Sequence, residues 1–419
     1  MTIETRPVRS RPRGRRRVAL AALAAVVGPG VLAGLSDDDP AGITTYSVLG
    51  ASYGYQLSWV LLLSTAALVL FHSLGARLGV ATGQGLIGLA RQRYGPRVGG
   101  VALLLLVLAN LGTTCAEFAG VAAGFELFGV SRYVSVPATA VVVSGLMLKG
   151  SFHRVEHLLM ALAAVLVAYV AAGFAVRPDW GRAAEGLVLP TMPFTHDAVL
   201  VVVATVGTTL APWGLSFIQS YAVDKKLTVA DLRYERIDVV TGSVLTGIVG
   251  LFVVVTCAAT LHARHQTITD ASDAASALQP LAGRFASALF AVGIIGAALL
   301  AAAVLPLSTA YSVCDFTGHE GALDDGFARA PLFYSTFAFC AAVSAGAVLL
   351  PGVSLVPVLV LTQVLNAVLL LPLLVVMYRL ARDADVMGAD TIGRSAVLYV
   401  LTIGFVGVCV AALMVLSLP

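Results

Sequence analysis

The sequence predicts an all-α integral membrane protein of eleven spans, in which two inverted halves of five spans are followed by one extra span. Two observations predict this fold class. The 419-residue chain is 58% hydrophobic and only 12% charged, whereas soluble domains have about 25% charged residues. Two of its apolar segments, five spans apart, also contain the same Pro-x-Gly interruption, at Pro40 and at Pro212.

The apolar segments have the length that a membrane span needs, since about 20 helical residues cross the hydrocarbon core of a bilayer. We expect spans over residues 18–52 (broken), 55–75, 98–121, 133–148, 155–176, 197–223 (broken), 238–262, 284–312, 331–350, 354–378 and 396–418. The loops between them are short. We therefore expect a basic tail over residues 1–17, a single transmembrane domain over residues 18–419, and no second domain.

The distribution of Lys and Arg predicts the orientation. If the N-terminus is cytoplasmic, all but five of the 26 Lys and Arg residues lie on the cytoplasmic side, as the positive-inside rule requires. The five exceptions are Arg132, Arg177, Arg182, Arg264 and Arg284. We therefore expect a protein of the cell (inner) membrane with its C-terminus outside. The arginine-rich start is interpreted as a solvated tail that orients the first span, not as a nucleic-acid-binding segment or a cleaved signal peptide.

The two interruptions predict the position of a binding site. They read Asp39-Pro40-Ala41-Gly42 and Ala211-Pro212-Trp213-Gly214. Proline removes a helix hydrogen bond and glycine frees the backbone, so each break exposes carbonyl oxygens. Such backbone is tolerated in a membrane only where protein buries it or it lines a wet cavity. Matched breaks in two inverted halves are typical of LeuT-type transporters, with the site at the midplane.

Acidic side chains accompany the first break. Asp37, Asp38 and Asp39 are adjacent, so they cannot all face one point, and Asp39 is the best placed to bind a cation together with free carbonyls. Its alternative role is to cap the helix that follows the break. Glu117 is the other deep acid, and it serves either the ion path or a hydrogen bond between packed helices.

Amide side chains form a second polar group, and several other kinds of site are absent. Gln363 and Asn366 share one helix face, where they either join helices or coordinate a cation. No Cys-x-x-Cys pair occurs, and the His-x-x-His spacing at His262 and His265 lies at the end of an expected span, which argues against a zinc enzyme. The five cysteines are scattered, and no Gly-x-x-x-x-Gly-Lys loop for ATP is present.

Several motifs resemble the NRAMP divalent-metal transporters. In that family a Gly-Pro-Gly precedes an Asp-Pro-Gly-Asn motif at the spacing seen here between Gly28-Pro29-Gly30 and Asp39-Pro40-Ala41-Gly42. Further matches are Tyr53-Gly54-Tyr55, Trp59–Ser64, Ala76–Gly83, Arg91-Gln92-Arg93-Tyr94 and Ala116-Glu117. The resemblance covers most of the chain and is strongest over residues 28–120.

The chain departs from that family at informative positions. Gly42 replaces the motif asparagine, Ala211 replaces the metal-binding methionine, and Trp213 replaces the histidine linked to proton movement. Thr114 stands where the family has a further acid, and the ninth span lacks the family's arginine. This pattern resembles the divergent NRAMP-related magnesium transporters. A thioether favours transition metals over Mg²⁺, so its loss fits a harder, hydrated ion.

The resemblance implies an importer of hydrated divalent cations, chiefly Mg²⁺ and also Mn²⁺, without obligatory proton coupling. It implies no resident cofactor, no obligate protein partner and no enzymatic activity; its partners are the ions and the lipid bilayer. Asp39 would supply the main carboxylate. The other residues expected at the ion or in its cavity are the carbonyls of Ala41 or Gly42 and of Thr208, the Gln363 side chain, Asp38, Thr209, Asn366, Ala211, Trp213 and Glu117.

Three alternatives stay open. One is a proton-coupled Mn²⁺/Fe²⁺ importer of the ordinary NRAMP type, with Asp37, Asp38 or Glu117 carrying the proton. Another is a Na⁺-coupled carrier of an organic solute with the LeuT fold, although the acids argue against an anionic substrate there. The last is an intramembrane aspartyl protease, which would need facing aspartates from two spans; only the first span carries deep aspartates.

Overall fold

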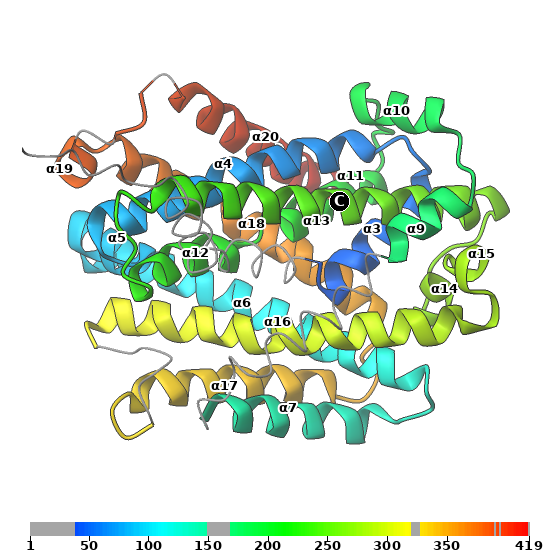
Figure 1. Cartoon of the computed structure of the whole chain (residues 1–419), viewed down its shortest axis with the longest axis horizontal. Coiled ribbons are helices and arrows are strands. Elements are labelled where there is room, and N and C mark those ends of the chain that lie inside the picture. The colour runs from blue at the N-terminus through cyan, green and yellow to red at the C-terminus, as the bar shows by residue number, and fades with distance from the viewer. Residues whose placement is uncertain (1–37, 149–167, 320–326, 389–390, 394, 418–419) are drawn as a thin grey trace, which may run out of the picture.

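The computed structural model describes residues 38–148, 168–319, 327–388, 391–393 and 395–417, and over these residues the chain is helical. The long helices run along the length of the molecule (Figure 1). The helices are α3 (Pro40–Tyr53), α4 (Ser58–Thr82), α5 (Leu86–Tyr94), α6 (Pro96–Glu126), α7 (Arg132–Leu148), α9 (Ala168–Ala175), α10 (Trp180–Val188), α11 (His196–Thr209), α12 (Pro212–Asp224), α13 (Leu232–Thr260), η2 (His262–Arg264), α14 (Ala271–Ser276), α15 (Gln279–Ala282), η3 (Gly283–Phe285), α16 (Ala286–Thr317), α17 (Pro331–Val348), α18 (Leu355–Arg382), α19 (Ala384–Met387) and α20 (Ala396–Leu416).

Eight segments within the described ranges are long and apolar enough to cross a membrane. They correspond to the second, third and sixth to eleventh expected spans. The first, fourth and fifth are represented by shorter pieces, because α3 has 14 residues, α7 has 17 and α9 has 8. The start of the first span and most of the fifth lie outside the described residues, as do the tail over residues 1–17, Gly28-Pro29-Gly30 and Asp37.

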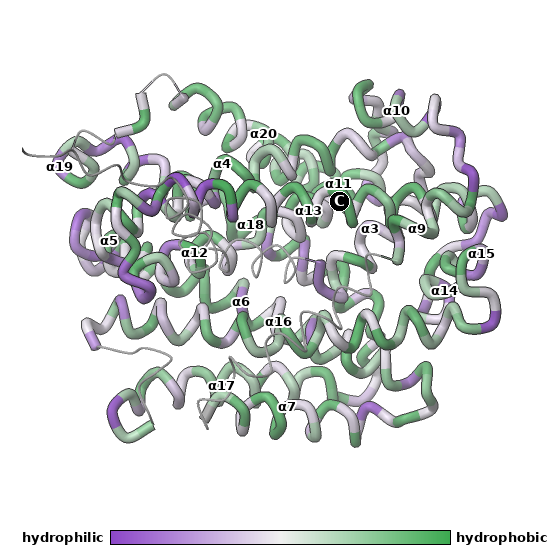
Figure 2. The backbone as a smooth tube through the Cα atoms, viewed as in Figure 1, coloured by the Kyte–Doolittle hydropathy of each residue, from purple (hydrophilic) through white to green (hydrophobic). Residues whose placement is uncertain are grey.

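The two ends of the molecule are polar, and the region between them is apolar. We call the end with α5 and α19, at the left of Figure 1, the α5 end, and the end with α10, α14 and α15 the α10 end. Figure 2 shows hydrophilic residues concentrated at these ends, and hydrophobic residues along the long helices between them. This distribution is what a membrane-spanning helical bundle requires.

Helices α3 and α12, which follow the two breaks, begin at proline. Pro40 and Pro212 occupy the first turns of these helices, where the missing N–H would be unsatisfied in any case. Leu210 and Ala211 have non-helical backbone between α11 and α12. The sixth span is therefore broken as predicted. It is also the most buried of the spans, which places its break in the interior of the protein.

Candidate metal-binding centre

The break of the sixth span provides a backbone oxygen. In an uninterrupted helix the Thr208 carbonyl would accept a hydrogen bond from the N–H of residue 212. Residue 212 is proline and has no N–H, so this carbonyl lacks its helical donor. The Thr208 hydroxyl is buried and has no hydrogen-bond partner among the residues that the structure describes. Both oxygens of this residue are thus candidates for a ligand.

At the first break, Asp39 caps the helix that follows it. Its Oδ1 accepts a hydrogen bond from the Gly42 N–H at 2.5 Å, which is the capping role considered from the sequence. Asp38 is also buried, and within the described ranges neither of its carboxylate oxygens has a hydrogen-bond partner. A buried carboxylate without a partner is costly, so Asp38, next to the capping Asp39, marks a place where a cation would be favourable.

The predicted ligand role of the Ala41 or Gly42 carbonyl stays a prediction, and the geometry of α3 bears on it. Both residues lie in the first turn of α3, where carbonyl oxygens point along the helix toward the N–H groups four residues later. The Asp39 carbonyl already accepts the Ile43 N–H at 2.9 Å.

A close contact between two helices brings Glu117 to Asp39. Gly120 of α6 faces Pro40 so closely that a Cβ at residue 120 would lie 2.2 Å from the Pro40 Cβ. Glu117 lies one turn earlier on α6, fully buried, with its carboxyl group within direct interaction range of Asp39. Neither Glu117 oxygen has a hydrogen-bond partner among the described residues. Two such carboxyl groups require a proton or a cation between them.

Helix α18 contributes the amide side chains. A Cβ at Gly207 would lie 1.9 Å from the Gln363 backbone oxygen, so α18 passes directly beside the end of α11 and Thr208. The Gln363 Oε1 accepts from the Asn366 Nδ2 at 2.9 Å, and the same Nδ2 lies 2.8 Å from the Thr113 Oγ1 on α6. The structure thus brings Gln363 and Asn366 to the break and ties both to α6.

Helix α6 carries a polar stripe that the sequence analysis missed. Asn110, Thr113 and Glu117 are spaced three and four residues apart and are all buried, so they share one face. Asn110 Nδ2 donates to the Thr309 Oγ1 of α16 at 2.9 Å. The spacing of these residues could have predicted this stripe from the sequence, because polar side chains that recur on one face of a membrane helix face the interior of the protein.

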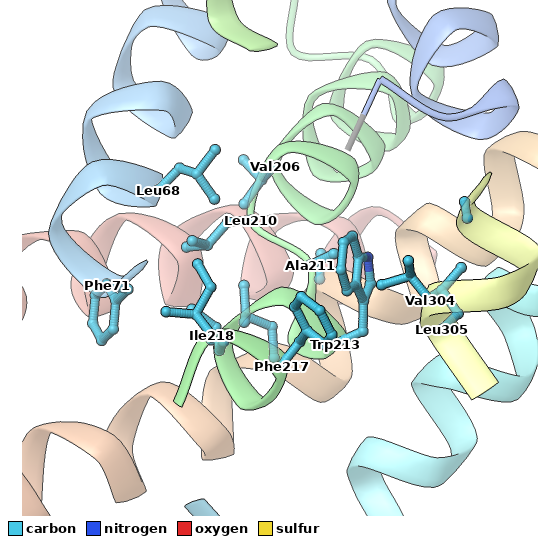
Figure 3. Close-up of a cluster of buried hydrophobic side chains, with 14 of the residues drawn as sticks. Leu68, Phe71, Val206, Leu210, Ala211, Trp213, Phe217, Ile218, Val304 and Leu305 are labelled. Atoms are coloured by element: carbon cyan, nitrogen blue, oxygen red, sulfur yellow. The ribbon is translucent and has the colours of Figure 1, made fainter. Parts of the chain in front are cut away.

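The remaining predicted residues surround the break of the sixth span. The hydroxyls of Thr209 and Tyr46 lie 2.9 Å apart and join α11 to α3. Ala211 directly precedes α12, and the buried Trp213 ring packs near Phe217, with their centroids 6.1 Å apart. Figure 3 shows Trp213 among apolar side chains that include Val304 and Leu305 of α16. The α12 side of the centre is therefore apolar.

The side chains gathered here are oxygen donors. Asp38, Asp39, Glu117, Thr208 and Gln363 are each at most 3% exposed, so an ion bound among them would be shielded from solvent. Within the described ranges, no group of three or more His, Cys, Asp or Glu side chains is arranged to hold an ion. A cation here would consequently depend on carbonyl, amide and water oxygens as well as on carboxylates, which suits hard divalent ions.

Comparisons with known proteins agree with this arrangement. Residues 30–417 match the model of the natural resistance-associated macrophage protein-like (Nramp) family. The divalent metal cation transporter MntH of Acidiphilium cryptum is 30% identical over 302 residues, which cover 70% of this chain and 69% of the relative. MntH of Pectobacterium carotovorum is 31% identical over 305 residues, covering 70% and 72%.

Solved structures show the same fold. A manganese transporter of Eremococcus coleocola superposes with a TM-score of 0.76 at 20% identity, covering 95% of this chain and 87% of that one. Mhp1, a nucleobase-cation-symport-1 family transporter, superposes with a TM-score of 0.57 at 15% identity, covering 93% and 90%. These likenesses confirm the LeuT-type fold predicted from the paired breaks. The chain belongs to the Nramp family and is a membrane transporter of divalent metal cations, not an enzyme.

Proposed function

We propose that the chain imports hydrated Mg²⁺, and also Mn²⁺, through the centre between the two broken spans. The observation that carries this proposal is the donor set, which consists of oxygen atoms around a break whose side-chain position 211 is alanine. Oxygen donors suit Mg²⁺ and Mn²⁺, whereas a sulfur donor would favour softer metals. The Eremococcus coleocola protein is a manganese transporter, which supports Mn²⁺ as a second substrate.

In this proposal Asp39 supplies the main carboxylate, with the Thr208 carbonyl and the Gln363 side chain as further ligands. Asp38, Thr209 and Asn366 hold water around the ion, and Glu117 balances charge beside Asp39. Mg²⁺ releases its water reluctantly and is commonly bound through one or two carboxylates. A centre with few direct ligands and buried polar groups around them meets this requirement.

The decisive experiment measures metal binding and uptake by the purified protein. Isothermal titration with Mg²⁺, Mn²⁺ and Ca²⁺ gives the order of affinities, and liposome flux shows which ions are carried. Asp39→Asn is expected to abolish Mg²⁺ and Mn²⁺ uptake while the protein still folds. Asp197→Asn is the matched control, because Asp197 is exposed in the first turn of α11. Normal uptake by Asp39→Asn, or no detectable Mg²⁺ binding by the wild type, would contradict the proposal.

Ala211→Met tests the chemistry of selectivity. A methionine at this position would place a soft sulfur beside the break, so we expect Cd²⁺ to compete with Mn²⁺ uptake by at least about tenfold more effectively than in the wild type, equivalent to about 1.4 kcal/mol. Ala211→Leu adds comparable volume without sulfur and serves as the control. Equal Cd²⁺ competition in the two variants would show that residue 211 does not face the ion.

We further propose that transport needs no obligatory proton coupling and follows the ion gradient and the membrane potential, worth about 2.3 kcal/mol per charge per 100 mV. The apolar surroundings of Trp213 support this, because that position offers no proton acceptor. The adjacent carboxyl groups of Asp39 and Glu117 favour the competing candidate, a proton-coupled Mn²⁺ importer. Acidification of the liposome lumen in step with metal uptake would establish the second candidate and refute the first.

The arrangement in the membrane is also proposed. Arg91, Arg93, Arg379 and Arg382 lie at the α5 end, which supports placing that end in the cytoplasm by the positive-inside rule. A cytoplasmic basic tail over residues 1–17, a single domain over residues 18–419 and an inner-membrane location follow from the same orientation. Accessibility of a cysteine introduced at the exposed position 319, in the loop after α16, would test the orientation in intact cells.

A further inference from the structure

A polar seam connects the centre to a cavity at the α5 end. Ser308 Oγ of α16 donates to the Trp213 carbonyl of α12 at 3.1 Å, and the Ser216 and Ser312 hydroxyls lie 2.8 Å apart one turn further along. The next step is Ser220 Oγ, which donates to the Asp315 Oδ2 at 3.4 Å. Every serine in this seam is at most 5% exposed. The seam is therefore a buried polar line that runs from the sixth-span break toward Asp315.

Asp315 lies in the wall of a cavity of about 540 Å³ at this end. The cavity is formed by the loop before α5, by α5 itself and by the end of α16, and its lining includes Gln84, Gly85, Arg91, Cys314, Asp315 and His319. The carboxylate lies directly against the backbone of residue 85, because a Cβ there would be 1.6 Å from the Asp315 Oδ2. Only glycine leaves room for this carboxylate.

The charge of Asp315 is not neutralised by an ion pair in the part of the chain that the structure describes. Among the described residues, its carboxylate accepts a hydrogen bond from Ser220. The neighbouring cation, Arg91, donates instead to the Phe316 carbonyl and lies over the Phe316 ring, 5.2 Å from the centroid. Beside Ser220, the fully buried Gln219 donates Nε2 to the Gln84 carbonyl at 3.0 Å, and its Oε1 has no partner in the described part of the chain. Oxygen atoms with unused capacity thus accumulate where the seam meets the cavity.

We propose that Asp315 forms a second divalent-cation subsite, which holds a hydrated ion between its departure from the centre and its release at the α5 end. The inference rests on the proposed transport of hydrated divalent cations. One carboxylate and water can hold Mg²⁺ or Mn²⁺ only weakly, and the nearby charge of Arg91 weakens binding further. Weak binding is what an exit requires, since an ion must leave as readily as it arrives.

Metal-directed cleavage tests this subsite independently of transport. Purified protein is loaded with Fe²⁺ and treated with ascorbate and hydrogen peroxide, so that radicals formed at the bound metal cut the backbone nearby, and mass spectrometry locates the cuts. In the wild type we expect cuts at both breaks and at residues 84–92 and 314–319. Excess Mg²⁺ should suppress both sets.

Three variants separate the possible outcomes. Asp315→Asn keeps an acceptor for Ser220 but loses the charge, and it should lose the cuts at residues 314–319 while keeping those at the breaks. Asp39→Asn should show the opposite result. Ser220→Ala removes the hydrogen bond but keeps the charge, and it should cleave like the wild type.

The second subsite is overturned if the wild type shows no cuts at residues 314–319, or if those cuts persist in Asp315→Asn. It is also overturned if they disappear in Asp39→Asn, because the ion at the centre would then account for them. Cuts at residues 314–319 without cuts at the breaks would instead contradict the proposed central site and leave the subsite supported.

Discussion

At the scale of single residues, two prolines determine where the backbone can bind an ion. Pro212 leaves the Thr208 carbonyl without its helical donor, and Pro40 begins α3 directly after the capping residue Asp39. Both breaks could be recognised in the sequence, whereas the backbone ligand at the first break stays a prediction. Ala41 and Gly42 lie in the first turn of α3, where carbonyls are oriented to bond within the helix.

Gly120 is a residue whose importance only the structure reveals. A methyl group at this position would overlap Pro40 and push α6, with Glu117, away from Asp39. We expect Gly120→Ala to cost about 1–3 kcal/mol of stability through overpacking and to abolish most metal uptake. The control is Gly145→Ala in α7, where a Cβ would meet no atom within 4 Å.

Thermal unfolding in detergent and Mn²⁺ flux into liposomes measure the two effects. A Gly120→Ala protein with wild-type melting temperature and uptake would contradict the close packing of α6 on α3. Loss of uptake in Gly145→Ala as well would mean that any glycine replacement impairs the protein, and the comparison would then carry no information on Asp39.

At the scale of elements, α6 holds the centre together. In its polar stripe, Glu117 lies beside Asp39, Thr113 bonds to Asn366 of α18, and Asn110 bonds to Thr309 of α16. The positions of this stripe were visible in the sequence, but its partners were not. Thr113 and Asn366 are 253 residues apart in the chain, and a single sequence does not show which faces of distant helices meet. The periodicity of polar residues predicts which face of a helix is buried, whereas tertiary packing determines which other helix that face contacts.

Thr113→Val tests this link between α6 and α18. Valine keeps the shape of threonine but cannot bond Asn366, so the buried amide loses one of its partners at a cost of about 1–3 kcal/mol. We expect a lower melting temperature and weaker Mn²⁺ binding, because Asn366 positions Gln363. Thr402→Val is the control, since the Thr402 hydroxyl donates to the Leu398 carbonyl of its own helix. Equal binding affinity in both variants would exclude a positioning role for Thr113.

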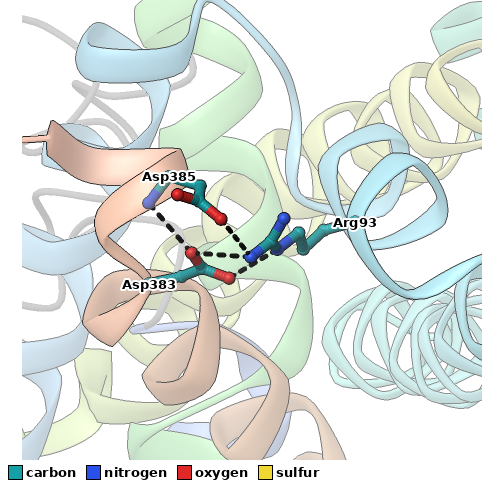
Figure 4. A network of polar contacts seen from close by, with 3 residues as sticks. All are labelled: Arg93, Asp383 and Asp385. Atoms are coloured by element: carbon teal, nitrogen blue, oxygen red, sulfur yellow. Dashed lines mark hydrogen bonds and ion pairs between the residues drawn. The ribbon is translucent and has the colours of Figure 1, made fainter.

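At the scale of the whole molecule, an arginine clamps each end. At the α10 end, Arg132 pairs with Glu126 at 2.8 Å and donates to the Val353 carbonyl. At the α5 end, Arg93 of α5 pairs with Asp383 at 2.5 Å and Asp385 at 2.8 Å, beyond the end of α18 (Figure 4). These hydrogen bonds raise the pKa of Arg93 further above its usual value, so the clamp stays charged at any physiological pH. Exposed ion pairs contribute little to stability, so loss of this clamp should not unfold the protein. Because α5 lines the cavity beside Asp315, the clamp also holds one wall of that cavity in place.

Breaking the α5-end clamp should therefore open that end without unfolding the protein. Cys314 lines the cavity and is 3% exposed, so its labelling by a water-soluble thiol reagent, located by mass spectrometry, reports opening. We expect Arg93→Ala to label faster than the wild type with an unchanged melting temperature, and Arg132→Ala to label at the wild-type rate.

Because salt screens exposed charges over roughly 10 Å at 0.1 M, added salt should accelerate labelling of the wild type but not of Arg93→Ala. If Cys314 reacts equally slowly in all three proteins at every ionic strength, α5 does not move when its clamp is released, and the cavity opens by another route.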